Sequence, residues 1–497
     1  MAFGENLDKL VEDTGGLLGK HEKWERIRLG EVAEVINGFA FKSKYFSKDE
    51  GEPLVRIRDV LSGETGTLYN GPQVDGYDIE VGDLLIGMDG DFNSSRWKGR
   101  KALLNQRVCR VDFKTKLYHP RLLSYALPGY LNKINEHTSA VTVKHLSSKT
   151  VKNIPLPLPS LAEQERIVDK IDELFSSIEA GERAIEQARA GVARYRKAIL
   201  KAAVTGELTA DWRDENPTKE SAKDLLSRIL TARYEAWEKS ELAKLNAKGK
   251  ACPETEKQWE KFRARYKPPV EPDIEGLPDL PDGWLWVTLP QLGEFGRGKS
   301  KHRPRGHPSL YGGEYPFLQT GRIRNSNGRI RTFDKTYNEK GLAQSRLWPK
   351  GTVCITIAAN IAETGILDFD ACFPDSVVGL IPHPDLGPEY PEFFLRTARD
   401  NLDRYAPGSA QKNINLGILE KVSVPFPSKV EQAEIVNRVE QALSKADAVE
   451  ATLDAQSRAA KALKQAVLKI AFEGKLVPQN PKDEPASELL KRIKEET

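Results

Sequence analysis

Two stretches of the chain carry apolar residues at alternating spacings of four and three, each over about five heptads. The first begins after Ser160 and the second after Ser428. Such a narrow seam predicts a coiled coil, because a helix that packs on a globular core usually has a broader apolar face. The alternative is that each helix packs on its own globular domain. The predicted seam residues are Ile167, Ile171, Leu174, Ile178, Val192, Tyr195, Ile199, Ile435, Val439, Val449, Leu453, Leu463 and Val467.

Each long helix has a predicted beginning and end. Ser160 and Ser428 each precede a glutamate by three residues. This spacing predicts a capping box, in which the serine hydroxyl accepts from the glutamate amide and the glutamate side chain accepts from the serine amide. Gly206 and Gly474 can adopt the left-handed conformation that ends a helix. Each helix is then about 68 Å long, and the Glu-Gln pair at its start is assigned to capping rather than to catalysis.

The regions before the two long helices also repeat. Both begin at a tryptophan, Trp24 and Trp284, and continue with short β-like runs separated by glycine, asparagine and aspartate. Runs of four to six residues with such turns predict a β-rich domain with a few helices. The corresponding helices are expected at residues 122–133 and 391–405. The fold class is therefore α+β, with two mixed α/β globular domains in tandem duplication.

The segment between the two halves has a different character. Residues 221–246 and 254–266 are highly charged helical patterns, and residues 267–283 are rich in proline, which extends a chain. Residues 480–493 at the C-terminus resemble residues 216–229 in sequence. A chain that repeats head to tail in this way can close into a pseudo-twofold circular arrangement, with an antiparallel pair of long helices.

Composition limits the functional classes. The net charge is +3 on 75 basic and 72 acidic residues, so any nucleic-acid surface must be local. The four cysteines contain no Cys-x-x-Cys motif, which argues against zinc and against a disulfide scaffold. No stretch approaches 18 apolar residues, and the N-terminus lacks a basic region followed by an apolar run. We therefore expect a soluble, cytoplasmic protein without membrane contact.

Motifs for catalysis or metal binding are weak. Residues 293–300 match the P-loop pattern G-x-x-x-x-G-K-S, but the sequence that follows cannot begin the helix that a P-loop requires. A basic turn is the better interpretation. His302 and His307 lack a third ligand at motif spacing, and Asp89 with Asp91 is more typical of a turn than of a cation site. We predict no catalytic residue and no metal ligand.

Local clusters of positive charge are the strongest functional signal. Residues 296–331 contain nine lysines and arginines against one acid, and residues 96–116 contain eight against one. Arginine clusters in loops of a near-neutral protein are typical of contacts to phosphates and guanine edges, whereas an ordinary solvated face mixes both signs. The candidate DNA-binding residues are Arg56, Arg58, Arg96, Lys98, Arg100, Lys101, Lys144, Arg297, Lys299, Lys301, Arg303, Arg305, Arg322, Arg324, Arg329, Arg331 and Lys412.

Three features together resemble the specificity subunit of type I restriction–modification systems. They are the repeated Trp-x-x-x-x-Leu domain start, the repeated Pro-x-Pro-Ser-x-x-Glu-Gln-x-x-Ile-Val helix start, and the paired long helices. The resemblance covers nearly the whole chain. It implies an arm (1–20), a first target-recognition domain (21–159), a central helix (160–206), a charged insert with a linker (207–283), a second target-recognition domain (284–427), a C-terminal helix (428–474) and a tail (475–497).

The resemblance also implies a function. Each target-recognition domain would read one half of a bipartite sequence in double-stranded DNA, and the antiparallel coiled coil would set the unread spacer. The subunit would lack catalytic activity and cofactors of its own. It would recruit two methyltransferase subunits, which methylate adenine with S-adenosylmethionine, and two restriction subunits, which translocate and cleave DNA with ATP and Mg²⁺. The competing hypotheses are a nucleotide-dependent DNA-modifying enzyme that uses residues 293–300, and a coiled-coil assembly scaffold without sequence reading.

Overall fold

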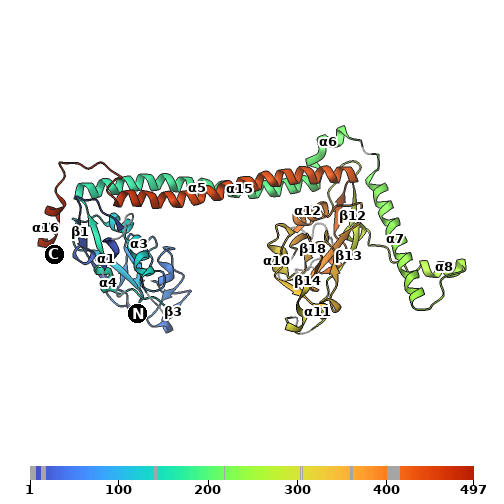
Figure 1. Cartoon of the computed structure of the whole chain (residues 1–497), viewed down its shortest axis with the longest axis horizontal. Helices are drawn as coiled ribbons and strands as arrows, with labels where there is room; N and C mark the ends of the chain where they lie inside the picture. Colours follow the sequence, from blue (N-terminus) through green and yellow to red (C-terminus); the bar gives the residue numbers. More distant parts are fainter. Residues whose placement is uncertain are drawn as a thin grey trace. The chain divides into compact units, whose positions relative to one another are not determined.

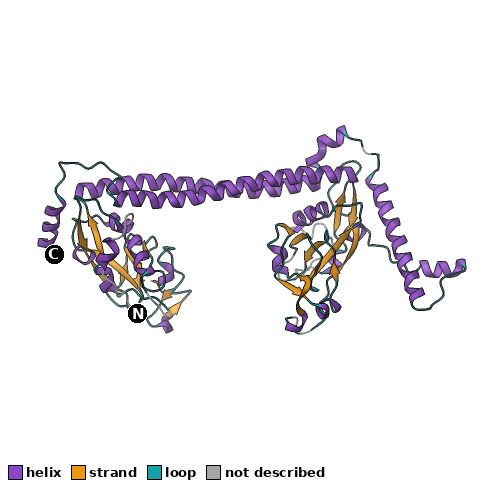
Figure 2. Cartoon of the chain, in the orientation of Figure 1, coloured by secondary structure: helices purple, strands orange, loops and turns teal. Residues whose placement is uncertain are grey.

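The computed structural model describes residues 7–12, 18–138, 143–217, 219–302, 304, 306–358, 362–399 and 415–496. The chain divides into two units. The first unit comprises Met1–Gln187 and Leu453–Thr497, and the second comprises Ala188–Thr452. The long helices α5 (Leu161–Thr205) and α15 (Lys429–Phe472) each contribute one end to each unit. Figures 1 and 2 show strands and shorter helices gathered into a globular part in each unit.

In its described residues, the first unit has three small sheets and several helices. A two-stranded sheet pairs the domain start with the segment before α5, and its strands are β1 (Glu25–Arg28) and β11 (Pro155–Leu158). The central sheet has the order β2 (Ala33–Asn37), β10 (Val108–Phe113), β7 (Leu84–Gly87) and β8 (Ser94–Arg96). The third has the order β3 (Phe46–Ser47), β5 (Leu68–Tyr69), β4 (Glu52–Val55), β9 (Ala102–Leu104) and β6 (Asp78–Ile79). The helices are α1 (Leu7–Glu12), α2 (Leu29–Val32), η2 (Ser43–Tyr45), η3 (Ile57–Asp59), α3 (Pro120–Glu136), α4 (Ser148–Lys152) and α16 (Ala486–Glu496).

The described part of the second unit likewise has three sheets. The strand pair is β12 (Leu285–Thr288) and β22 (Ser423–Phe426). The central sheet has the order β13 (Gly293–Arg297), β21 (Val377–Pro382), β18 (Val353–Thr356), β19 (Thr364–Leu367) and β15 (Gly328–Ile330). The third has the order β16 (Lys335–Tyr337), β14 (Tyr311–Phe317), β20 (Ala371–Cys372) and β17 (Leu347–Trp348). The helices are η4 (Glu207–Thr209), α6 (Ala210–Glu215), α7 (Ala222–Ala247), α8 (Glu256–Arg263), α9 (Leu289–Leu292), η5 (Pro308–Leu310), α10 (Thr320–Arg324), α11 (Glu339–Ala343), α12 (Glu389–Ala398) and α14 (Leu416–Leu419).

The two units share one topology. The order β2-β10-β7-β8 in the first central sheet corresponds to β13-β21-β18-β19 in the second, and each unit closes with an antiparallel pair between its first and last strands. The predicted α+β tandem duplication is therefore confirmed. The helix expected at residues 122–133 lies within α3. The helix expected at residues 391–405 ends at Ala398 in α12, and residues 400–414 lie outside the described residues.

Each end of the long-helix pair belongs to a globular core. In the first unit, Ile171 near the start of α5 lies in one buried cluster with Val467 near the end of α15 and with residues of α3 and β11. In the second unit, Ala203 near the end of α5 lies in one cluster with Ile435 near the start of α15. The two helices are therefore antiparallel within each unit. Burial of these apolar side chains stabilises the helix ends, at about 25 cal/mol per Å² of apolar surface removed from water.

Away from those cores the seam is more polar than the sequence pattern predicts. Tyr195, Val449 and Leu463 are 43%, 47% and 52% exposed, so these three seam assignments differ from the structure. Ion pairs between the helices lie in the same regions. Arg196 contacts Glu450 at 2.6 Å in the second unit, and Lys464 contacts Glu182 at 2.7 Å in the first. Exposed pairs of this kind contribute little stability. The middle of each long helix is therefore held mainly by its own backbone hydrogen bonds and by the packed ends, rather than by apolar contacts between the helices.

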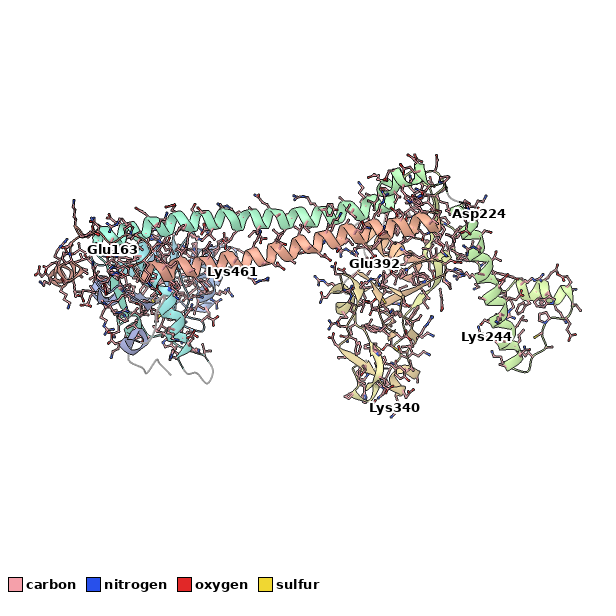
Figure 3. The ribbon with its side chains drawn as sticks, turned by 45° about the horizontal axis from the view of Figure 1, so that its top comes forward. Glu163, Asp224, Lys244, Lys340, Glu392 and Lys461 are labelled. Atoms are coloured by element: carbon pink, nitrogen blue, oxygen red, sulfur yellow. The ribbon has the colours of Figure 1, made fainter. Side chains whose placement is uncertain are left out.

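The predicted helix caps are half correct. Ser160 Oγ accepts from the Glu163 amide at 3.2 Å, as expected, and Gly206 and Gly474 have φ of 77° and 69° at the helix ends. The glutamate side chain, however, does not return to the serine. In the described residues, the buried Glu163 carboxylate accepts instead from Trp24 Nε1 at 3.0 Å and from the side-chain amide of Gln479. Figure 3 shows Glu163 at the beginning of α5.

The second copy repeats this arrangement. Glu431 is 3% exposed, and its carboxylate accepts from Trp284 Nε1 at 2.8 Å, from Thr209 Oγ1 at 2.8 Å and from Arg213 Nε at 2.9 Å. We call the pairs Trp24–Glu163 and Trp284–Glu431 the tryptophan–glutamate clamps. Each clamp joins the first residue of a repeated domain to the start of a long helix, so it sets how that domain is attached.

Candidate nucleic-acid interface

In the first unit, a buried tryptophan shapes the basic loop that follows β8. Trp97 is buried, and its Nε1 donates to the carbonyl oxygen of Arg100 at 2.8 Å. This bond folds residues 97–100 into a compact turn that exposes the side chains of Lys98 and Arg100. Arg96, in β8, is half-buried. The turn therefore presents two cations to solvent and keeps the tryptophan in the core.

The other candidate residues of the first unit have local partners. Lys101 Nζ lies 3.5 Å from Asp78, and this carboxylate raises the pKa of the lysine. Arg58 lies beside Asp59, with its Nε 3.6 Å from the carboxylate. The Arg56 guanidinium lies 6.0 Å from the centre of the Phe46 ring. Lys144 Nζ donates to the backbone and side-chain oxygens of Asn135. In these residues the side chains are oriented by the fold, which reduces the entropy lost on binding.

In the second unit, three exposed cations lie at the end of β13 and in the loop after it. These are Arg297, Lys299 and Lys301. Arg297 Nε donates to the backbone oxygen of Asp375, and the carbonyl oxygen of Lys299 accepts from Ser345 Oγ at 2.8 Å. These bonds hold the loop against neighbouring segments while the lysine side chains remain in solvent. Arg303, Arg305 and Lys412 lie outside the described residues.

The arginines at the end of the second cluster differ among themselves. Arg329 is half-buried and pairs with Glu389 at 2.6 Å and with Asp368 at 3.3 Å. Arg322 pairs with Asp334, and the exposed Arg331 lies 3.5 Å from Asp368. Arg324 is also exposed. The structure therefore separates solvent-facing cations from Arg329, whose contacts are those of a structural ion pair. Sequence alone could not separate them, because the carboxylates that hold Arg329 come from distant positions.

Arg329 also borders a cavity of about 800 Å³ in the second unit. The cavity lies between α12 and the unit's part of the long-helix pair, and Figure 3 places Glu392 below that pair. The buried Glu392 carboxylate accepts from Arg396 at 2.8 Å and from Thr364 Oγ1 at 2.9 Å. Glu389 and Glu392 thus compensate the charges of Arg329 and Arg396 within the cavity wall.

One polar cluster in the first unit was not predicted from sequence. Asp89 accepts from His145 Nδ1 at 2.7 Å and lies 3.4 Å from Arg107 Nε. The Arg107 and His145 side chains are 56% and 43% exposed, and Asp89 is 24% exposed. The three residues come from three separate loops. No spacing in the sequence relates them, so only the topology of the sheet could bring them together.

The weak catalytic motifs have no catalytic geometry. Residues 293–297 form strand β13, and the described residues that follow contain no helix before the three-residue η5. The P-loop pattern therefore lacks the strand–loop–helix context. His307 Nδ1 accepts from the Ser309 amide at the start of η5. The described residues contain no group of three or more potential metal ligands, and none of their helices is long and apolar enough to cross a membrane.

Comparison with known proteins assigns this architecture to a family. The family described as type I restriction modification DNA specificity domain matches residues 21–187 and 281–456, which are the two repeated parts of the chain. The chain belongs to this family of DNA specificity subunits. A similar protein, the type I restriction enzyme EcoBI specificity subunit of Escherichia coli, is 33% identical over 512 residues. That match covers 100% of this chain and 97% of the relative.

Two further comparisons agree with this assignment. The type I restriction enzyme EcoDI specificity subunit of Escherichia coli is 23% identical over 483 residues, covering 95% of each chain. A solved chain from a study of complex assembly and conformational transition of the type I R-M system has a TM-score of 0.58 at 19% identity. It covers 91% of this specificity subunit and 98% of that chain, so the two share a fold.

This specificity subunit also carries a helical projection in its second unit. Leu225 and Ile229 at the start of α7 are buried in the unit's core. The rest of α7 extends away from the sheets, with α8 beside its far end (Figure 1). Aromatic contacts such as Trp237–Phe262, with ring centroids 5.3 Å apart, join the two helices. The start of α7 corresponds in sequence to α16, whose Leu489 is buried in the first unit's core.

Proposed function

We propose that this type I specificity subunit recognises a bipartite DNA target, with one half of the target bound by each unit. The observation that carries the proposal is the repetition of one architecture with different basic loops. Both units have the same central strand order and the same tryptophan–glutamate clamp, whereas the basic loops stand at different places in this frame, after β8 in the first unit and after β13, which corresponds to β2, in the second. A common frame with different exposed loops suits two readers of different half-sites.

The chemistry of the exposed loops supports DNA as the ligand. Lys98 and Arg100 in the first unit, and Lys299 and Lys301 in the second, are exposed on loops that are fixed by hydrogen bonds of their backbones or neighbours. Lysine and arginine on such loops bind phosphates, which orient a protein on the duplex, and arginine also binds guanine edges. The near-neutral net charge confines this interaction to the loops.

The long helices can set the distance between the two half-sites of the target. α5 and α15 have 45 and 44 residues, and the two ends of each helix belong to different units. In the proposed function, the helix pair fixes the separation of the two half-sites and therefore the length of the unread spacer. A seven-residue insert in both helices preserves the heptad phase and adds about 10 Å. It should lengthen the spacer in the methylated motif, whereas an unchanged spacer would contradict this role.

The proposed function assigns catalysis to partner subunits. The first five residues of the P-loop pattern, 293–297, form strand β13 rather than a phosphate-binding loop. In the proposed complex, two methyltransferase subunits use S-adenosylmethionine, and two restriction subunits use ATP and Mg²⁺. The relatives support such an assembly because they are named as subunits of type I restriction enzymes.

A domain exchange tests the reading of separate half-sites. Residues 284–427 are replaced by the corresponding domain of the EcoBI specificity subunit, and the chimaera is expressed with the methyltransferase partner of this chain. Long-read methylation sequencing should show a motif that changes in one half only. The reciprocal exchange of residues 21–159 is the matched control and should change the other half. A change in both halves from either exchange would refute the proposal.

A second measurement tests the contribution of the basic loops. The double variant Lys299→Ala/Lys301→Ala removes two exposed cations from the second unit. If both contact phosphates, the slope of log K against log salt for the assembled complex should fall in magnitude by about 2. A slope equal to that of the wild type would show that this loop does not contact the DNA backbone.

A further inference from the structure

We propose that Arg107 binds a guanine edge in the half-site bound by the first unit, and that Asp89, itself held by His145, positions its guanidinium. This inference rests on the proposed function and names one base-reading centre within it. The centre is the cluster of Asp89, Arg107 and His145 described above.

The loops that carry this cluster are fixed by backbone hydrogen bonds. The Leu146 amide donates to the Met88 carbonyl oxygen at 2.7 Å, and the Gly90 amide donates to that of Lys144 at 3.1 Å. These two bonds flank the bridge between Asp89 and His145. The Met88 amide donates in turn to the carbonyl oxygen of Arg107 at 2.9 Å. The cluster is therefore preorganised. A group that must match the geometry of a base edge requires such preorganisation.

The backbone of Arg107 is unusual for its residue type. Its φ is 72°, in the left-handed region that favours glycine. The equivalent position in the second unit is Ser376, because Val108 and Val377 occupy the same register in β10 and β21. Ser376 is not among the described non-glycine residues with positive φ. By contrast, Phe92 and Ala362 have positive φ at corresponding places in both units, so their conformation belongs to the shared architecture. The conformation of Arg107 is specific to the first unit.

Strain of this kind is retained where the side chain has a use. Glycine at position 107 would adopt the same backbone conformation without a Cβ, so the turn itself does not require arginine. The side chain is also not buried, since 56% of its surface is exposed. The function of the Arg107 side chain therefore depends on the contacts that its guanidinium makes.

The contacts of the guanidinium leave one edge available. Asp89 lies beside Nε at 3.4 Å, and His145 Nδ1, which carries the proton donated to Asp89, lies 3.4 Å from Nη1 and cannot accept from it. Among the described residues, no hydrogen-bond partner contacts Nη2. The short bond between His145 Nδ1 and Asp89 places the imidazole proton on Nδ1, because the carboxylate can only accept. Asp89 thus orients the side chains of both Arg107 and His145. The Arg107 guanidinium in turn compensates the negative charge of Asp89, which would otherwise repel a phosphate backbone.

The position of the cluster also suits contact with a large ligand. At the start of α3, the His119 amide donates to Gln164 of α5 at 2.7 Å. At the other end of α3, the side chain of Asn135 donates to the Gly90 carbonyl oxygen beside the cluster. The 17-residue helix places these ends about 24 Å apart. The cluster therefore lies at the end of the domain remote from α5, where an exposed arginine can enter a groove.

Guanine is the base that this arrangement fits best. A guanidinium donates two parallel hydrogen bonds to O6 and N7 of guanine in the major groove, and this pairing is the most common specific contact between proteins and DNA. Adenine offers N7 as an acceptor but presents a donor at N6, which repels an arginine donor. The Asp89 carboxylate beside Nε restrains the orientation of the guanidinium.

The test uses the full complex of this chain with its methyltransferase partner and long-read methylation sequencing. Arg107→Ala and Arg107→Gly should both relax one G·C position in one half of the motif. Discrimination at that position should fall by roughly 5- to 150-fold, as for the loss of one bidentate contact. Arg107→Gly also removes the strain of a Cβ at positive φ, so its melting temperature should equal or exceed that of the wild type. Lys152→Ala, an exposed charge at the end of α4, is the matched control and should keep the wild-type motif.

Asp89→Asn tests the positioning role. It should relax the same G·C position, and the double variant Asp89→Asn/Arg107→Ala should show no further relaxation than Arg107→Ala. An unchanged motif for Arg107→Ala, or a uniform loss of methylation with an unchanged motif, would overturn the inference, the second by indicating a phosphate contact. In both cases a bipartite wild-type motif would leave the proposed function standing. A wild-type motif without two separate halves would refute the proposed function itself.

Discussion

Removal of the Glu431 carboxylate tests whether the tryptophan–glutamate clamp attaches the second domain to α15. Glu431 accepts from Trp284, Thr209 and Arg213, and it is 3% exposed. Glu431→Ala leaves the three donors without their acceptor. Breaking a buried ion pair by removing one partner costs about 3–5 kcal/mol, and an unsatisfied neutral donor costs about 1–3 kcal/mol. These costs are not additive because the three donors share one acceptor.

We therefore expect Glu431→Ala to lower the free energy of unfolding of the second unit by about 3–5 kcal/mol. Glu431→Gln retains one acceptor oxygen for Trp284 but loses the charge that faces Arg213, so its cost should be smaller. Urea unfolding, followed by tryptophan fluorescence and by far-ultraviolet circular dichroism, measures both effects. The control is Glu440→Ala, an exposed glutamate on the same helix, which should change stability by about 0–1 kcal/mol. A loss for Glu431→Ala no larger than for this control would refute the reasoning.

Two further predictions concern cysteine reactivity and pH. Burial raises the pKa of Cys109 to about 12 and also raises those of Cys354 and Cys372, so native chain should react with Ellman's reagent at Cys252 only. Rapid reaction of two or more thiols would contradict this. Arg166 lowers the pKa of Asp483, so the pair's stabilisation is present above about pH 4 and is lost as pH falls further. Asp483→Asn should therefore lower the melting temperature at pH 6, and this difference should shrink toward pH 3; a constant difference would exclude the pair as its cause.

Several features of the fold follow from local sequence patterns. The beginning and end of α5 and α15 were predictable because a serine cap and a left-handed glycine act within one helical turn. The duplication was predictable because its motifs recur in the same order. The central strand order, however, depends on pairing between segments far apart in the chain, such as β2 with β10. Short runs of apolar residues carry no information about such partners.

The contacts of Glu163 show the limit of prediction from local sequence. The capping-box spacing predicted that Glu163 would bond to the nearby serine amide, yet its carboxylate bonds to Trp24, which is 139 residues away. The buried Trp24 Nε1 needs a hydrogen-bond acceptor, and the Glu163 carboxylate supplies it. Sequence spacing identifies only the nearby hydrogen-bond donor, which is the serine amide.

The sequence by itself determined the α+β duplication, the two long helices with their ends, and the presence of two basic clusters. Those features rest on periodicity, on turn-forming residues and on local charge density, which are all short-range properties. The tertiary structure decided which cations remain in solvent and which, like Arg329, are held by carboxylates. It also brought Asp89, Arg107 and His145 together from three loops. Ion pairing and burial depend on distances through space, and the linear order of residues does not contain those distances.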